Sequence, residues 1–94
     1  MSEIHDSAGR LADYWLTLLS DTTWEEAAAS IHEHLPRPCG ETTQITEGDS
    51  MFDVSDSWEW VDAVDGDIRL TVEVFDRAGS DNPKAIRETL IRRG

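Results

Sequence analysis

The sequence predicts an α+β fold, in which an N-terminal helical hairpin packs on a small antiparallel β-meander of three to four strands, followed by a short C-terminal helix. Three observations predict this class. Apolar residues recur with helical spacing up to about residue 35. From residue 41 the composition shifts to Thr, Val, Ile, Trp and Phe, which is typical of strands. The final residues carry a helix start signal. A chain of 94 residues is expected to form one domain, residues 1–94.

The first helix is expected from about residue 7 to residue 20. Its apolar residues follow the stripe of a helix with one buried face. They are Leu11, Tyr14, Trp15, Leu18 and Leu19. Thr22 with Glu25, and Thr23 with Glu26, each fit the capping box that begins a second helix. The prolines of "PRPCG" end this second helix, and the short link between the helices predicts an antiparallel hairpin.

Four strands are expected after the helices. They cover residues 42–46, 50–54, 57–63 and 68–76. The fourth has the clearest pattern, because aliphatic residues alternate with polar ones from Ile68 to Val74. The segment "DNPKAIRETLIRR" then predicts a third helix, since it has a cap, a proline at the first helical position, and Ile86 and Leu90 one turn apart.

Two turn types are compatible with the hairpin before the fourth expected strand, and they orient its tryptophans differently. A two-residue type I′ turn at Asp65-Gly66 would place Trp60 opposite Thr71. Trp58 and Trp60 would then lie on the polar face as an aromatic contact patch. Glu59 would lie among aliphatic side chains, where burial of its charge is costly.

A three-residue loop at Val64–Gly66, with the glycine in the left-handed conformation, would place Trp60 opposite Leu70 and Trp58 opposite Val72. This register buries both indoles and turns the glutamate between them outward. Burial of each indole is worth about 2 kcal/mol or more, so we favour this second register.

The charge of the chain is unevenly distributed. Its net charge is −12, and residues 1–68 carry 16 acidic but only 2 basic side chains. Between Cys39 and Ile68 there are nine carboxylates and no Lys or Arg. Such a surface repels phosphate backbones, which argues against direct nucleic-acid binding, and it attracts a basic protein.

The reactive residue types form no motif that predicts a cofactor, a metal or catalysis. His32 and His34 are two residues apart and diverge by about 200° on a helix, and no second cluster completes a zinc site. Cys39 lacks a nucleophile signature. The carboxylates of residues 47–56 and 62–67 do not follow the EF-hand order.

The sequence predicts a cytoplasmic protein without a membrane segment. The most apolar stretch, residues 11–19, is short and contains Asp13. The N-terminus lacks a basic region followed by an apolar one. A single cysteine cannot form an internal disulfide, which suits a reducing compartment.

These observations favour a non-catalytic binding protein whose acidic surface docks on a basic protein partner. The partner could be a nuclease or a nucleoprotein complex, blocked in the manner of an immunity protein, an antitoxin or a phage-encoded inhibitor. The expected contact residues are Asp49, Asp53, Asp56, Glu59, Asp62, Asp65 and Asp67.

Two alternatives belong to other classes. The first is a small enzyme or ligand-binding domain with a pocket between helices and sheet, lined by Tyr14, Trp15, His32 and Trp60. The second is a domain that is acidic only because its host is salt-adapted, and that forms a homodimer or larger oligomer through an exposed edge strand.

Overall fold

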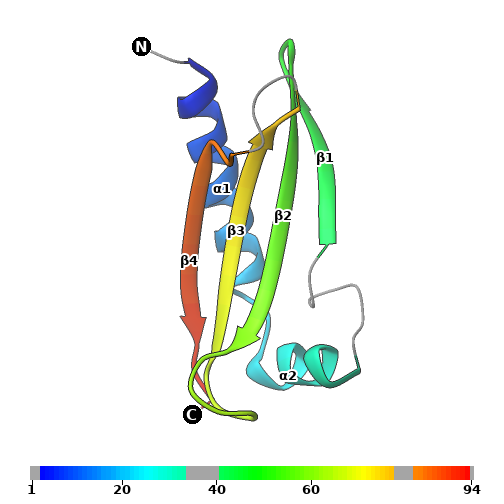
Figure 1. The fold of residues 1–94 in the computed structure, drawn as a ribbon, viewed down its shortest axis with the longest axis vertical. Helices are drawn as coiled ribbons and strands as arrows, with labels where there is room; N and C mark the ends of the chain where they lie inside the picture. Colours follow the sequence, from blue (N-terminus) through cyan, green and yellow to red (C-terminus); the bar gives the residue numbers. More distant parts are fainter. Residues whose placement is uncertain (1–2, 34–40, 78–81, 94) are drawn as a thin grey trace.

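The computed structural model describes residues 3–33, 41–77 and 82–93, and it shows an α+β fold with two helices and a four-stranded antiparallel sheet (Figure 1). The strands are arranged in chain order, β1-β2-β3-β4. The elements are α1 (Glu3–Leu19), α2 (Trp24–Glu33), β1 (Glu41–Glu47), β2 (Ser50–Trp60), β3 (Ile68–Asp76) and β4 (Ala85–Ile91).

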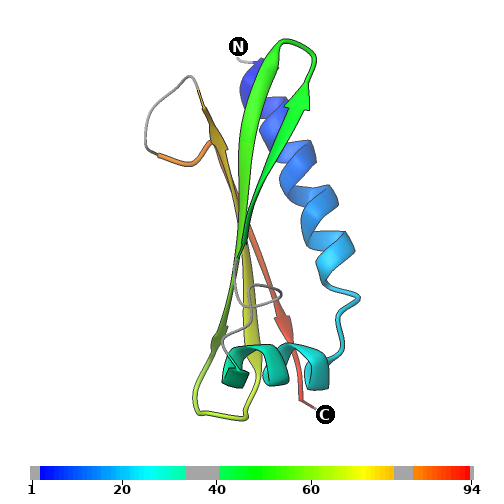
Figure 2. The same ribbon diagram turned by 90° about the vertical axis from the view of Figure 1, so that its right-hand side faces the viewer.

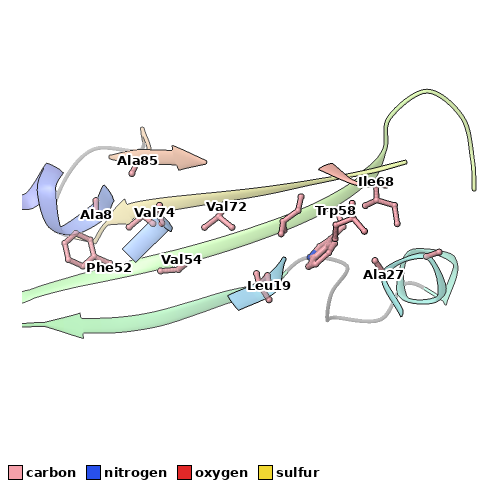
Figure 3. Close-up of a cluster of buried hydrophobic side chains, with 14 residues drawn as sticks. Ala8, Leu19, Ala27, Phe52, Val54, Trp58, Ile68, Val72, Val74 and Ala85 are labelled. Carbon is pink, nitrogen blue, oxygen red and sulfur yellow. The ribbon is translucent and has the colours of Figure 1, made fainter. Parts of the chain in front are cut away.

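The helices cover one face of the sheet. Helix α1 runs along β3 and β4, whereas α2 lies across the end of the sheet near the C-terminus (Figure 2). Small residues of α1, Ala8 and Ala12, are fully buried and let the helix approach the strands closely. Figure 3 shows the resulting core, with Phe52, Val54 and Trp58 of β2 beside Val72 and Val74 of β3.

The expected helical hairpin does not form, because α1 and α2 each pack on the sheet rather than along one another. A turn separates them, in which the N–H of Thr22 donates to the carbonyl of Leu19 at 3.0 Å. Thr23 then caps α2, since its hydroxyl accepts the backbone N–H of Glu26 at 3.2 Å. The buried Ala27 and Ala28 turn toward the core, so the small residues of α2 pack against the sheet.

The two expected strands 50–54 and 57–63 are one continuous strand, β2. The polar residues Ser55 and Asp56 resemble a turn in sequence, but each pairs with β3 within the ladder. Alternation along β2 is unbroken from Phe52 to Trp58, which puts Asp56 on the buried face. The strand 42–46 extends by one residue at each end to become β1, and the strand 68–76 coincides with β3.

The hairpin between β2 and β3 adopts neither expected register. Trp58 lies opposite Leu70 and Trp60 opposite Ile68, two residues away from the favoured alignment. The tryptophans nevertheless lie on the face predicted by that alignment, because a shift of two residues keeps every side chain on its side. Trp58 is buried and Trp60 packs against the core, while Glu59 points outward.

The expected C-terminal helix is instead strand β4, paired antiparallel with β3. The spacing of Ile86 and Leu90 fits one turn of helix but also fits a strand, where both residues lie on one face. Backbone pairing with the otherwise free edge of β3 decides between the two, as tertiary context commonly overrides helix propensity. In the strand, Ala85 and Ile91 become the buried residues.

Candidate functional site

The seven carboxylates expected to form one contact surface lie in four different environments. Asp56 is 2% exposed and therefore cannot contribute to a surface. Its carboxylate accepts the indole N–H of Trp58 at 2.8 Å. The sequence places Asp56 in a turn, and the unbroken strand β2 corrects that placement.

Asp53 and Glu59 lie on the open face of the sheet, Glu59 beside Arg69 of β3 and Asp53 beside Arg77, the residue that follows β3. Arg77 Nε is 3.8 Å from a carboxylate oxygen of Asp53, and Arg69 Nη1 is 3.2 Å from one of Glu59. These cations come from the basic C-terminal part of the chain and reduce the negative charge of the open face. The segment between Cys39 and Ile68 has nine carboxylates and no Lys or Arg in the sequence. In the folded protein, arginines from a later part of the chain lie beside two of these carboxylates.

The remaining four carboxylates lie at opposite ends of the sheet. Asp49 occupies the tight turn between β1 and β2, and Asp62, Asp65 and Asp67 occupy the loop of residues 61–67 between β2 and β3 (Figure 1). A strand of eleven residues separates the two groups by about 35 Å. Only the second group can act as a local cluster.

Helix α2 holds the loop 61–67 in place. The indole N–H of Trp24 donates to the carbonyl of Gly66 at 2.8 Å. His32 Nε2 lies 2.7 Å from Asp65 Oδ1, and because a carboxylate only accepts, the imidazole donates this hydrogen bond. Asp65 has a left-handed backbone, with φ 68°. The sequence predicts this conformation for Gly66, but the neighbouring Asp65 adopts it instead.

The C-terminal residues also contact the loop. The backbone N–H of Arg93 donates to the Asp67 carboxylate at 3.1 Å, and its guanidinium donates to the Asp65 carbonyl at 2.8 Å. Arg93 Cζ also lies 5.0 Å from the ring centroid of Trp24. Helix α2, the loop 61–67 and the C-terminal residues therefore contact one another at this end of the sheet.

Acidic residues of α2 and of the turn before it lie at the same end of the molecule as the loop (Figure 2). Asp21, Glu25, Glu26 and Glu33 are all exposed, as is Asp62 of the loop, while Asp65 and Asp67 are half-buried. We define these seven residues as the acidic end: Asp21, Glu25, Glu26, Glu33, Asp62, Asp65 and Asp67. Asp21, Glu25, Glu26 and Glu33 are not among the carboxylates that the sequence predicts as contact residues. Glu25 and Glu26 fit a helix capping pattern, which accounts for them without a binding partner.

The aromatic residues expected to line a pocket form two separate pairs. The rings of Tyr14 and Trp15 are 6.2 Å apart on α1, and those of His32 and Trp60 are 5.3 Å apart at the acidic end. No ring contact among the described residues joins the two pairs. Tyr14 is mostly exposed on α1 rather than directed into the sheet interface.

Within residues 3–33, 41–77 and 82–93, no three His, Cys, Asp or Glu side chains are arranged to hold a metal ion. His34 and Cys39, whose side chains are of types that bind metal ions, lie outside the described residues. The same described segments include no helix with the length and apolarity that a bilayer crossing requires.

Comparisons of the chain with known protein families, with curated proteins and with solved structures find no match.

Proposed function

We propose that this protein is a non-catalytic binding protein whose acidic end docks on a basic surface of another protein. The observation that carries the proposal is the convergence of α2, the turn before it and the loop 61–67, which places seven carboxylates at one end of an elongated molecule of 41 × 22 × 20 Å. Arg92 and Arg93 lie at this end and offset part of its negative charge.

The charge at this end is suited to attract a cationic partner over distance. Exposed like charges grouped on one surface create a potential that raises the association rate with an oppositely charged protein, and salt screens this effect. The acidic residues of the open sheet face are less suited, since Asp53 and Glu59 each lie beside an arginine. The partner should therefore approach the end of the molecule.

Glu33 supports an electrostatic role rather than a purely local one. It is the last residue of α2, where the negative end of the helix dipole disfavours a carboxylate. Glu25 and Glu26, by contrast, sit in the first turn and stabilise the helix locally. The charge of Glu33 adds to the field of the acidic end without benefit to the helix.

The partner class follows from the charge pattern. A protein surface that accepts several carboxylates in close proximity is a surface suited to phosphate groups, because both are recognised by Arg and Lys. We propose that the protein acts in the cytoplasm as an inhibitor that covers such a surface on a nuclease or nucleoprotein complex. Competition with nucleic acid would then block the partner.

Charge reversal at the acidic end tests this proposal. Glu33→Lys/Asp62→Lys changes two exposed residues of the acidic end, and Asp49→Lys/Glu88→Lys makes the same change in net charge at exposed positions elsewhere. Each tagged protein is used to capture partners from nuclease-treated host lysate, with elution by salt and identification by mass spectrometry. The association rate of the purified partner is then measured.

We expect the acidic-end variant to lose the salt-eluted partner and to associate about tenfold more slowly. The control variant should retain the partner, with a smaller change in rate. Equal effects of the two variants would show that only net charge matters, and an unchanged association rate in both would exclude electrostatic docking.

A further inference from the structure

The Trp24 ring and the Asp65 carbonyl together form a site that already holds a guanidinium group, and Asp67 binds the backbone beside it. Arg93 lies with its Cζ 5.0 Å from the centroid of the Trp24 ring, its guanidinium donates to the Asp65 carbonyl at 2.8 Å, and its backbone N–H donates to the Asp67 carboxylate at 3.1 Å. We propose that this is a receptor site for an arginine side chain of the partner, and that Arg93 occupies it in the free protein as a built-in competitor. The inference rests on the proposed function and specifies the chemistry of its contact.

The composition of the site is selective for arginine over lysine. Tryptophan offers the most favourable aromatic face for a cation, and a planar guanidinium can stack on it while its N–H groups donate at the edge. A carbonyl oxygen at that edge accepts such a donor. An ammonium group is compact and more strongly hydrated, so it satisfies the ring and the carbonyl together less well.

The site is held in shape by contacts that do not involve Arg93. Trp24 is fixed by its hydrogen bond to the Gly66 carbonyl at 2.8 Å and by its ring contact with Trp60, with centroids 6.3 Å apart. Asp65 is fixed by the hydrogen bond from His32 at 2.7 Å. The acceptor and the aromatic face therefore stay in position when the guanidinium leaves, and such preorganisation favours binding of a replacement.

Arg93 is placed so that it can leave. It lies two residues beyond the last residue of β4, Ile91, and it is exposed. Its departure breaks no strand pairing, because the ladder between β3 and β4 ends at the pair of Ile68 and Ile91. A partner arginine then takes its place, and the apparent affinity for that partner is reduced by the fraction of time the site is filled internally.

Arg93→Ala tests the proposal, with Arg92→Ala as the matched control. Arg92 is the adjacent exposed residue, so both variants remove one positive charge from the same end of the chain. The probes are an oligoarginine and an oligolysine peptide of equal length, and affinity is measured by titration calorimetry. We expect Arg93→Ala to bind oligoarginine about three- to tenfold more tightly than the wild type, the range for a site filled internally most of the time.

The binding of oligolysine should change equally little in the two variants. In NMR spectra, the indole N–H signal of Trp24 should shift on addition of oligoarginine to Arg93→Ala and respond far less to oligolysine. Trp24→Phe identifies this signal and, where it folds, should remove the preference for arginine.

The outcomes separate this inference from the proposed function. Equal gains for both peptides, or equal effects of Arg92→Ala and Arg93→Ala, would overturn the arginine site while salt-sensitive binding of both peptides still supported acidic docking. Failure of every variant to bind either peptide would overturn both.

Discussion

Trp58 donates its indole N–H to the carboxylate of Asp56, two residues earlier on the same face of β2, and the two groups meet inside the protein at 2.8 Å. A carboxylate in the core is costly unless it is hydrogen-bonded. Trp58 supplies such a bond and at the same time buries its ring opposite Leu70. The pair therefore allows an acidic residue to remain within an otherwise apolar strand face.

Removal of either partner should reveal their coupling. We expect Asp56→Ala to lower the free energy of unfolding by about 1–3 kcal/mol, because the indole N–H loses its acceptor in a buried site. Trp58→Phe should cost a similar amount through lost packing and an acceptor without its indole donor. Urea denaturation of both single variants and the double variant measures the pairwise energy.

The double variant should be less destabilised than the sum of the single variants by about 1 kcal/mol or more. Far-UV circular dichroism of each variant is the control for retained structure. Simple additivity would mean that the hydrogen bond contributes nothing beyond the separate packing of the two side chains.

Asp65 combines a left-handed backbone with a hydrogen bond to His32, and two substitutions test these features together, one that keeps both and one that removes both. Asparagine tolerates φ near +68° and keeps a side-chain oxygen, so Asp65→Asn should change the free energy of unfolding by less than about 0.5 kcal/mol. Valine is β-branched and lacks the acceptor, so Asp65→Val should cost more than about 1 kcal/mol. Thermal denaturation monitored by tryptophan fluorescence checks both, and equal stability of the two variants would contradict the strain argument.

The elements predicted correctly from sequence are those whose pattern has one structural solution. The alternation from Ile68 to Val74 fits only a strand, and β3 begins and ends at the expected residues. The segment that becomes β4 has two solutions, because Ile86 and Leu90 share a face in a helix and in a strand. The free edge of β3, a feature of the assembled sheet, selects the strand.

The candidate site is less predictable because it depends on which elements meet. The sequence identifies Asp62, Asp65 and Asp67 as part of an acidic run, and the structure keeps them together in one loop. The sequence does not reveal that α2 lies across the same end of the sheet. The contact between Arg93 and Trp24 joins residues far apart in the sequence, and no local pattern predicts such a contact.

Gly48 adopts a positive φ of 61° at the first position of the turn between β1 and β2, where type II′ hairpins place glycine. A Cβ atom added there would meet nothing within 4 Å, so any effect of substitution comes from the backbone alone. We expect Gly48→Ala to lower the free energy of unfolding by about 1 kcal/mol and Gly48→Asn to cost less. Urea denaturation measures both, and a neutral alanine variant would show that the turn can relax to a negative φ.

The two isoleucines of β4 differ in burial, and this difference tests whether the C-terminal element is a strand or a helix. Ile91 is 9% exposed on the core face, whereas Ile86 is 51% exposed on the open face. In a strand, Ile91→Ala should therefore cost about 2 kcal/mol and Ile86→Ala less than about 1 kcal/mol. In an amphipathic helix with Ile86 and Leu90 on its buried face, Ile86→Ala would be the more damaging change.

Chemical denaturation of the two variants gives the order of their stabilities. Slow amide exchange of the residues that pair with β3 provides a second measurement that is independent of side-chain size. A larger loss for Ile86→Ala, together with exchange protection that follows helical rather than strand pairing, would contradict the four-stranded sheet.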